Sequence, residues 1–152
     1  MGTEPTLSKR RIAKPLGIYV ITLFDAIAIG LFPLIVLFFL DNDPGIQISE
    51  FDYYLTALLR VLVVASALGA MMGEDLGRRI LLGAVTAASI SMVVNSINIL
   101  SSNQAAGTQS AGLVGNITRG IFWIGINWWY FKRREVVDYY KQQKDAQRID
   151  SA

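Results

Sequence analysis

The sequence predicts an all-α membrane protein whose four transmembrane helices form an up-down bundle, with both termini in the cytoplasm. Composition is the first observation: of 152 residues, 53% are hydrophobic and only 17% are charged, whereas soluble domains carry about a quarter charged residues. The second is the grouping of apolar residues into four runs, each near the roughly 20 residues that span the hydrocarbon core. The third is the placement of basic residues on alternate connections. The runs lack the alternation of barrel strands, so helices are expected.

The first span is predicted at residues 15–40, after a basic N-terminal segment at residues 1–14. A basic stretch before an apolar run is also typical of a signal peptide. This run, however, exceeds the roughly 7–15 apolar residues of a signal peptide, and no A-x-A-like site follows it. We therefore expect residues 15–40 to remain as a transmembrane helix. Pro33 cannot donate a backbone hydrogen bond to Ile29, which predicts a kink.

The other three spans are predicted at residues 53–72, 80–100 and 111–131, and a basic juxtamembrane tail follows at residues 132–152. The connections between consecutive spans are short, and short connections imply antiparallel neighbours. The tail is expected to act as a cytoplasmic anchor beside the membrane. A docking helix and a contact with anionic lipid are the alternatives.

Orientation follows from the basic residues, which accumulate on the cytoplasmic side of membrane proteins. Twelve of the fourteen lysines and arginines flank the spans on one side: Lys9, Arg10, Arg11, Lys14, Arg78, Arg79, Lys132, Arg133, Arg134, Lys141, Lys144 and Arg148. The connections on the other side contain no basic residue, and the first of them is acidic. Both termini are therefore predicted to lie inside.

Three charged residues are predicted near the middle of the bilayer: Asp25 on the first span, Arg60 on the second and Arg119 on the fourth. A central Arg or Asp costs roughly 2.5–3.5 kcal/mol on insertion scales. These side chains are therefore expected to face the inside of the bundle. Polar amides in the outer halves of spans three and four complete the predicted polar core: Asn95, Asn98 and Asn116.

Two interpretations of these charges remain open. Asp25 could form a structural ion pair, with Arg119 as the favoured partner and Arg60 as the alternative, and so fix the helix register. One acid cannot neutralise two arginines, however, and the surplus positive charge suggests an anionic ligand, a lipid headgroup, a water-filled cleft or the carboxylate of a partner chain. In that case an unpaired Arg60 is the better candidate for holding the anion.

Small residues are predicted to form helix-packing faces, because they let helix backbones approach closely in membranes. They lie four residues apart on the first three spans and eight apart on the fourth: Ala26, Gly30, Ala65, Gly69, Gly83, Ala87, Gly112 and Gly120.

The residue types argue against most chemistry. The chain contains no cysteine and no histidine, which excludes thiolate and imidazole metal sites and the nucleophiles based on them. Asp25 lacks a paired base, metal or nucleophile. We therefore expect no metal, no cofactor, no enzymatic activity and no nucleic-acid partner.

Two segments carry a resemblance: "KPLGIYVITLFDAI" opens the first span, and "WWYFKRREVVDYY" closes the fourth. In them the chain resembles a loose group of small prokaryotic proteins with four transmembrane helices. Those proteins typically begin with a basic residue, Pro, any residue and Gly, and end with an aromatic cluster, an Arg-Pro-type dipeptide and a Val…Tyr pair. Glu135 stands where Pro is usual. The resemblance implies a four-span topology in a prokaryotic cytoplasmic membrane, and it implies no activity.

The favoured function is a non-enzymatic accessory or structural subunit, which associates with other membrane proteins or with copies of itself through the small-residue faces. The short loops and the lack of an extramembrane domain favour it. The alternative is a small transporter, channel or binding protein whose buried Asp, Arg and Asn side chains admit an anion or a lipid headgroup. The expected surroundings are the lipid bilayer, with anionic lipid as a candidate ligand.

Overall fold

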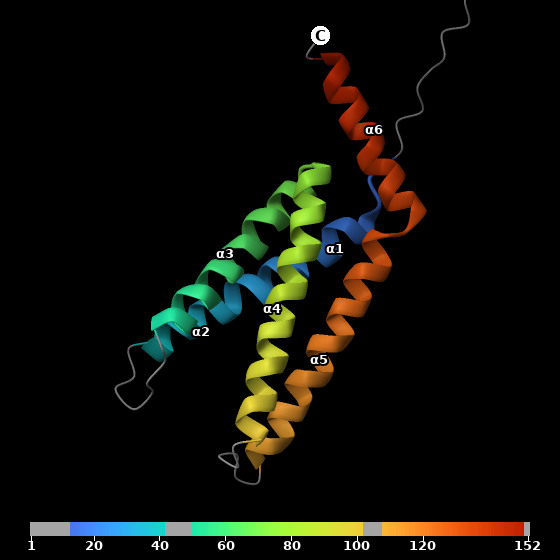
Figure 1. Ribbon diagram of the computed structural model, residues 1–152. Coiled ribbons are helices and arrows are strands. Elements are labelled where there is room, and N and C mark those ends of the chain that lie inside the picture. Colours follow the sequence, from blue (N-terminus) through green and yellow to red (C-terminus); the bar gives the residue numbers. More distant parts are fainter. Residues whose placement is uncertain (1–12, 42–49, 102–107, 151–152) are drawn as a thin grey trace, which may run out of the picture.

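The computed structural model describes residues 13–41, 50–101 and 108–150, which form helices joined by short turns (Figure 1). The helices are α1 (Leu16–Phe24), the π-helical segment η1 (Asp25–Leu31), α2 (Phe32–Asp41), α3 (Glu50–Met71), α4 (Asp75–Ser101), α5 (Thr108–Phe131) and α6 (Arg134–Asp150). No strand occurs within these ranges, so the predicted all-α class is confirmed. Most of the basic N-terminal segment and most of the two connections on the acidic side lie outside the described residues.

Three stretches in the described ranges are long and apolar enough to cross a membrane: Leu16–Phe39, Glu50–Met71 and Asp75–Ser101. They overlap the first three predicted spans, at residues 15–40, 53–72 and 80–100. Helix α5 is 24 residues long, but it is not one of these three, and its sequence includes Asn116, Arg119 and Asn127. The fourth crossing therefore stays a prediction.

Helices α1, η1 and α2 follow one another without a break and form a single rod (Figure 1). At the end of η1 the backbone N–H of Phe32 bonds to the carbonyl of Ile27, five residues earlier. The α-helical pattern would need a donor four residues after each carbonyl, and Pro33 cannot supply one for Ile29. The rod thus has a wide π-helical turn directly before the proline, at the place where the sequence predicts a kink.

Helix α3 packs along the rod and beside α4, and α4 packs beside α5 (Figure 1). Glycines allow two of these close approaches. A Cβ atom on Gly30 would come within 2.6 Å of Cγ2 of Val64, and a Cβ atom on Gly77 would come within 2.6 Å of the backbone nitrogen of Ala70. Gly73, with φ of 90°, lies in the short turn between α3 and α4, where a left-handed backbone favours glycine.

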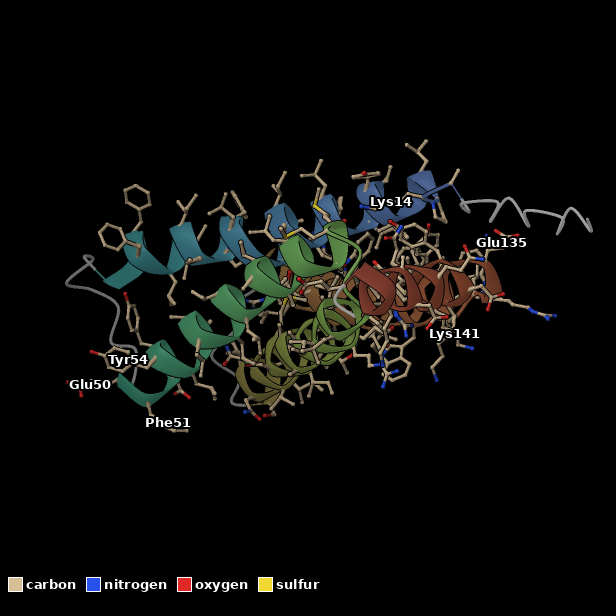
Figure 2. All side chains as sticks on the ribbon, turned by 90° about the horizontal axis from the view of Figure 1, so that it is seen from above. Lys14, Glu50, Phe51, Tyr54, Glu135 and Lys141 are labelled. Carbon is tan, nitrogen blue, oxygen red and sulfur yellow. The ribbon has the colours of Figure 1, made fainter. Side chains whose placement is uncertain are left out.

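The two ends of the molecule differ in their charged residues. Lys14, Glu135 and Lys141 lie toward one end, and Glu50, Phe51 and Tyr54 lie at the other (Figure 2). We call these the basic end and the acidic end. Many of the fully buried side chains lie where the start of α4, the end of α5 and the start of α6 meet: Leu81, Val85, Phe131, Val136 and Tyr140.

Helix α6 docks against the basic end of the bundle. The hydroxyl of Tyr140 donates a hydrogen bond of 2.8 Å to the carbonyl oxygen of Ala70 at the end of α3. At the same end, the guanidinium of Arg78 on α4 donates a hydrogen bond of 2.8 Å to the carbonyl oxygen of Phe131, the last residue of α5. Tyr140 is fully buried. The described part of the tail thus packs as a helix on the chain's own bundle, and its role as a membrane anchor, a docking helix or a lipid contact stays a prediction.

Candidate functional site

A cleft of about 570 Å³ opens between α3, α4, α5 and the rod formed by α1, η1 and α2. Its volume lies within the roughly 300–1,000 Å³ of typical ligand pockets. The walls are mostly apolar, with two charged side chains among them: Phe24, Ala28, Ile29, Phe32, Pro33, Val36, Leu37, Thr56, Arg60, Ala88, Ser89, Met92, Arg119, Gly120, Phe122 and Trp123. We call it the arginine cleft, after Arg60 and Arg119.

Arg60 is held by the rod that faces it. One terminal nitrogen of its guanidinium donates a hydrogen bond of 3.0 Å to the carbonyl oxygen of Ile29. Pro33 cannot donate to this carbonyl, because proline has no backbone N–H. The residue is only 9% exposed, and its Nε has no hydrogen-bond partner among the described residues. Buried polar groups normally find partners, so this guanidinium retains unused capacity to donate.

Arg119 approaches the same cleft from α5, and its side chain stays exposed. The ion pairs among the described residues join Asp75 to Arg78 and Arg79, and Arg134 to Asp138. None of them includes Arg60 or Arg119. The cleft therefore presents two cations that no described carboxylate neutralises.

Asp25 does not form the ion pair that the sequence predicts with Arg119 or Arg60. Its side chain is fully buried. Its Oδ1 accepts a hydrogen bond of 2.5 Å from the indole N–H of Trp123 and one of 3.2 Å from the side-chain amide of Asn127. Both donors are neutral and come from α5. The prediction of a paired acid in the core was therefore wrong about the partner.

The two neutral donors are functional neighbours that the sequence prediction missed. Trp123 and Asn127 are four residues apart and so lie on one face of α5. The Asn127 amide also donates to the carbonyl oxygen of Trp123, at 3.2 Å. An indole N–H and an amide on the face that also carries Arg119 and Gly120 were the available signal. The spacing places both residues on that face, but it does not show that they reach Asp25.

The three predicted asparagines do not line the arginine cleft. Asn95 and Asn98 are exposed, and Asn116 is half-buried. Of the six predicted core residues, the structure thus brings Arg60 and Arg119 together in the cleft. It places Asp25 beside them, connected to the cleft wall through Trp123.

The predicted packing residues divide into two groups. Four of them lie against a neighbouring helix or are partly covered: Ala26, Gly30, Gly69 and Gly120. The other four are exposed on the surface of the chain: Ala65, Gly83, Ala87 and Gly112. Among the described residues, a Cβ atom on Gly83 or Gly112 would meet no neighbouring helix within 4 Å. Within this chain, then, half of the predicted positions hold helices together and half face outward.

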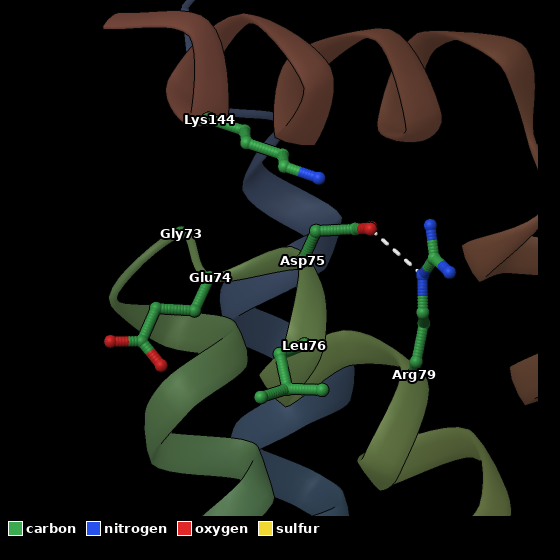
Figure 3. Close-up of a pocket in the computed structure, with 6 residues that line it drawn as sticks. All are labelled: Gly73, Glu74, Asp75, Leu76, Arg79 and Lys144. Carbon is green, nitrogen blue, oxygen red and sulfur yellow. Dashed lines mark hydrogen bonds and ion pairs between the residues drawn. The ribbon is translucent and has the colours of Figure 1, made fainter. Parts of the chain in front are cut away.

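A second pocket, of about 380 Å³, lies at the basic end (Figure 3). Its lining residues are Gly73, Glu74, Asp75, Leu76, Arg79 and Lys144. Asp75 lies 2.8 Å from Nε of Arg79 and 2.7 Å from the guanidinium of Arg78. Two acids and two bases line this pocket, whereas the lining of the arginine cleft includes two bases and no acid.

Comparison of the chain with protein-family models, with curated proteins and with solved structures finds no match. The resemblance to small prokaryotic four-span proteins therefore stays a prediction.

Proposed function

We propose that this chain is a non-enzymatic, multi-pass membrane protein whose arginine cleft binds an anionic amphiphile. The acidic headgroup would lie against Arg60 and Arg119, and an acyl chain would lie along the apolar wall. The observation that carries the proposal is the pair of arginines without a described carboxylate partner, in a cleft that is otherwise apolar.

Physical chemistry supports an anion at this position. Ionisable residues inside a membrane normally pair with one another, bind backbone carbonyls or line a pathway or cavity. The guanidinium of Arg60 donates a hydrogen bond to one such carbonyl, and its Nε has no hydrogen-bond partner among the described residues. A guanidinium presents several donors in a planar fork that matches carboxylate and phosphate oxygens. The phenyl rings of Phe32 and Phe122 line the same cleft and offer apolar surface to an acyl chain.

The test is a thermal-stability titration in mild detergent with oleate, and with the neutral monoacylglycerol of the same chain. A ligand at about 100 times its Kd stabilises the protein that binds it by about 2.7 kcal/mol. Oleate should therefore raise Tm by several degrees, and the neutral lipid should not.

Arg60→Gln should abolish this rise, whereas Lys141→Gln removes one positive charge from α6, away from the cleft, and should retain it. An equal rise with both lipids, or an unchanged rise in Arg60→Gln, would refute the proposal.

A second candidate function has its own observation. Gly83 and Ala87 are exposed on α4, and Gly112 and Gly115 are exposed on α5. Small residues on the outer surface of membrane helices allow another helix to approach closely. These faces favour an accessory subunit that associates with other membrane proteins or with copies of itself. A stoichiometric larger complex in native mass spectrometry from mild detergent would support this function, and a monomer from gently solubilised membranes would count against it.

The proposal includes the arrangement in the membrane. We infer that α5 crosses as the fourth span of an up-down bundle, and that the basic end with both termini faces the cytoplasm of a prokaryote. The separation of Lys14 and Lys141 from Glu50 along the molecule (Figure 2) supports this orientation, because basic residues accumulate on the cytoplasmic side.

A further inference from the structure

The proposed function leaves one buried acid unexplained. Asp25 is completely buried, yet both of its hydrogen bonds end on the same oxygen, Oδ1. The other oxygen, Oδ2, has no partner among the described residues. Asn127 is equally buried, and its side-chain carbonyl oxygen Oδ1 also lacks a partner there. Two neighbouring side chains that already share one hydrogen bond thus each have one unsatisfied acceptor.

Among the residues that the structure describes, no ion pair gives Asp25 a counter-charge. From α3 the nearest charged group is Arg60, whose guanidinium binds Ile29. From α5 it is Arg119, which lines the cleft and is exposed, while Trp123 and Asn127 are neutral. The charged residues of α4 are Asp75, Arg78 and Arg79 in its first turns, where they pair with one another. Helix α1 contributes no charged residue, and its Tyr19 is exposed.

An ionised Asp25 carboxylate would therefore raise the free energy of the folded protein. Burying a charge without a paired and hydrogen-bonded counter-charge costs so much free energy that the group normally neutralises instead. The two hydrogen bonds from Trp123 and Asn127 offset only part of that cost, because both come from neutral groups.

One added proton would give a hydrogen-bond partner to both oxygens that lack one, Oδ2 of Asp25 and Oδ1 of Asn127. A proton on Oδ2 of Asp25 turns that atom into an O–H donor, and the acceptor it needs is the unpartnered carbonyl oxygen of Asn127. The amide N–H of Asn127 already donates back to Oδ1 of Asp25. The second amide hydrogen serves the carbonyl oxygen of Trp123. Every polar atom of the pair would then have a partner.

We propose that Asp25 is a proton-binding site within the membrane, where the neutral carboxyl group and the amide of Asn127 form a reciprocally hydrogen-bonded pair. The ligand is a proton and not a metal ion, because two free oxygens are far fewer than the roughly six to eight that a cation such as calcium takes. A neutral Asp25 also leaves the positive charges of Arg60 and Arg119 uncompensated. The site itself does not depend on any ligand in the cleft.

The test is infrared spectroscopy of the full chain in lipid vesicles at neutral pH, without added amphiphile. The wild-type protein should show the C=O stretching band of a protonated, hydrogen-bonded carboxyl group, and carbon-13 labelling of aspartate should shift that band. Asp25→Asn should remove the band. Arg60→Gln should keep it, which separates this site from the arginine cleft.

Stability provides an independent readout. Asn at position 25 preserves a reciprocal pair with Asn127, so the Tm of Asp25→Asn should stay close to that of the wild type, while Asp25→Ala should lower it by several degrees. Three results would each overturn the proposal: no protonated-carboxyl band in the wild type, a band that disappears when sodium is added, or an Asp25→Asn protein that loses as much stability as Asp25→Ala.

Discussion

Arg60 and Pro33 act on the same carbonyl group. The proline removes the α-helical donor for the carbonyl of Ile29, and the guanidinium of Arg60 supplies another across the helix interface, at 3.0 Å. A freed carbonyl in a membrane helix normally finds such a substitute, because an unsatisfied backbone group is costly in hydrocarbon. Arg60 thus has a structural contact on one side of its guanidinium and a cleft on the other.

The hydroxyl of Tyr140 attaches α6 to the end of α3 through its hydrogen bond to Ala70. Burial raises the pKa of its phenol, so the hydroxyl remains a donor to the carbonyl of Ala70 well past neutral pH. A raised pKa means that this contribution is fully present below the unfolded pKa of about 10 and is lost as pH rises through the folded value. Tyr140→Phe should lower the free energy of unfolding by about 1 kcal/mol, with Tyr54→Phe at the acidic end as the matched control. Equal stability of the two variants in chemical denaturation would show that this bond does not hold α6.

The burial of Asp25 could be predicted from the sequence, but its hydrogen-bond partners could not. Depth along the spans correctly placed the acid inside the chain, and it is fully buried. Which side chain it meets depends on how η1 is rotated toward α5, and the packing of distant helices sets that rotation. The spacing of Trp123 and Asn127 was visible in the sequence. That spacing alone could not show that neutral donors would reach the carboxyl and that the arginines would not.

At the scale of helices, the first three spans were predictable from apolar length, and the structure has helices at all three places. The π-helical turn was not predictable, because a proline predicts a disturbed hydrogen-bond ladder but not the form it takes. The two groups of small residues were indistinguishable for a related reason. Gly30 and Gly83 both lie on apolar helices, and only the tertiary arrangement determines which of them meets a neighbour.

Substitution of these two glycines is predicted to have opposite outcomes. Gly30→Leu should destabilise the monomer by at least about 1–3 kcal/mol, the usual cost of overpacking, because even a Cβ atom would come within 2.6 Å of Val64. Gly83→Leu should leave monomer stability unchanged, since a Cβ atom there would meet no other described helix within 4 Å. Unfolding in detergent measures both. Loss of a larger complex in Gly83→Leu alone would assign this face to a partner, and equal monomer destabilisation would contradict the packing described here.

The whole molecule combines a closed basic end with an opening among its helices. Tyr140 and Phe131 pack together with the helix ends at the basic end, whereas the arginine cleft opens among the rod, α3, α4 and α5. A ligand site between helices of a bundle is a common arrangement. Under the proposed function, the packed basic end would hold the helices together while an amphiphile in the cleft exchanges with the bilayer.

The inferred topology is testable because the chain has no cysteine of its own. A single cysteine introduced at Asn42 or at Thr108 should react with a membrane-impermeant maleimide added to intact cells. Reporter domains fused before Leu7 and after Ala152 should both report the cytoplasm. Labelling at Asn42 only after the cells are opened would reverse the orientation.

Occupancy of the arginine cleft is the central claim, and Trp123 reports on it directly because its indole lines the cleft. The measurement is fluorescence quenching by a brominated fatty acid in a protein carrying Trp128→Phe and Trp129→Phe, so that Trp123 is the remaining tryptophan. Quenching should saturate with the acid, be much weaker with its neutral methyl ester, and disappear in Arg60→Gln while persisting in Lys141→Gln. Equal quenching by acid and ester in all three proteins would mean that Trp123 meets only bulk lipid, and it would contradict an anion site in this cleft.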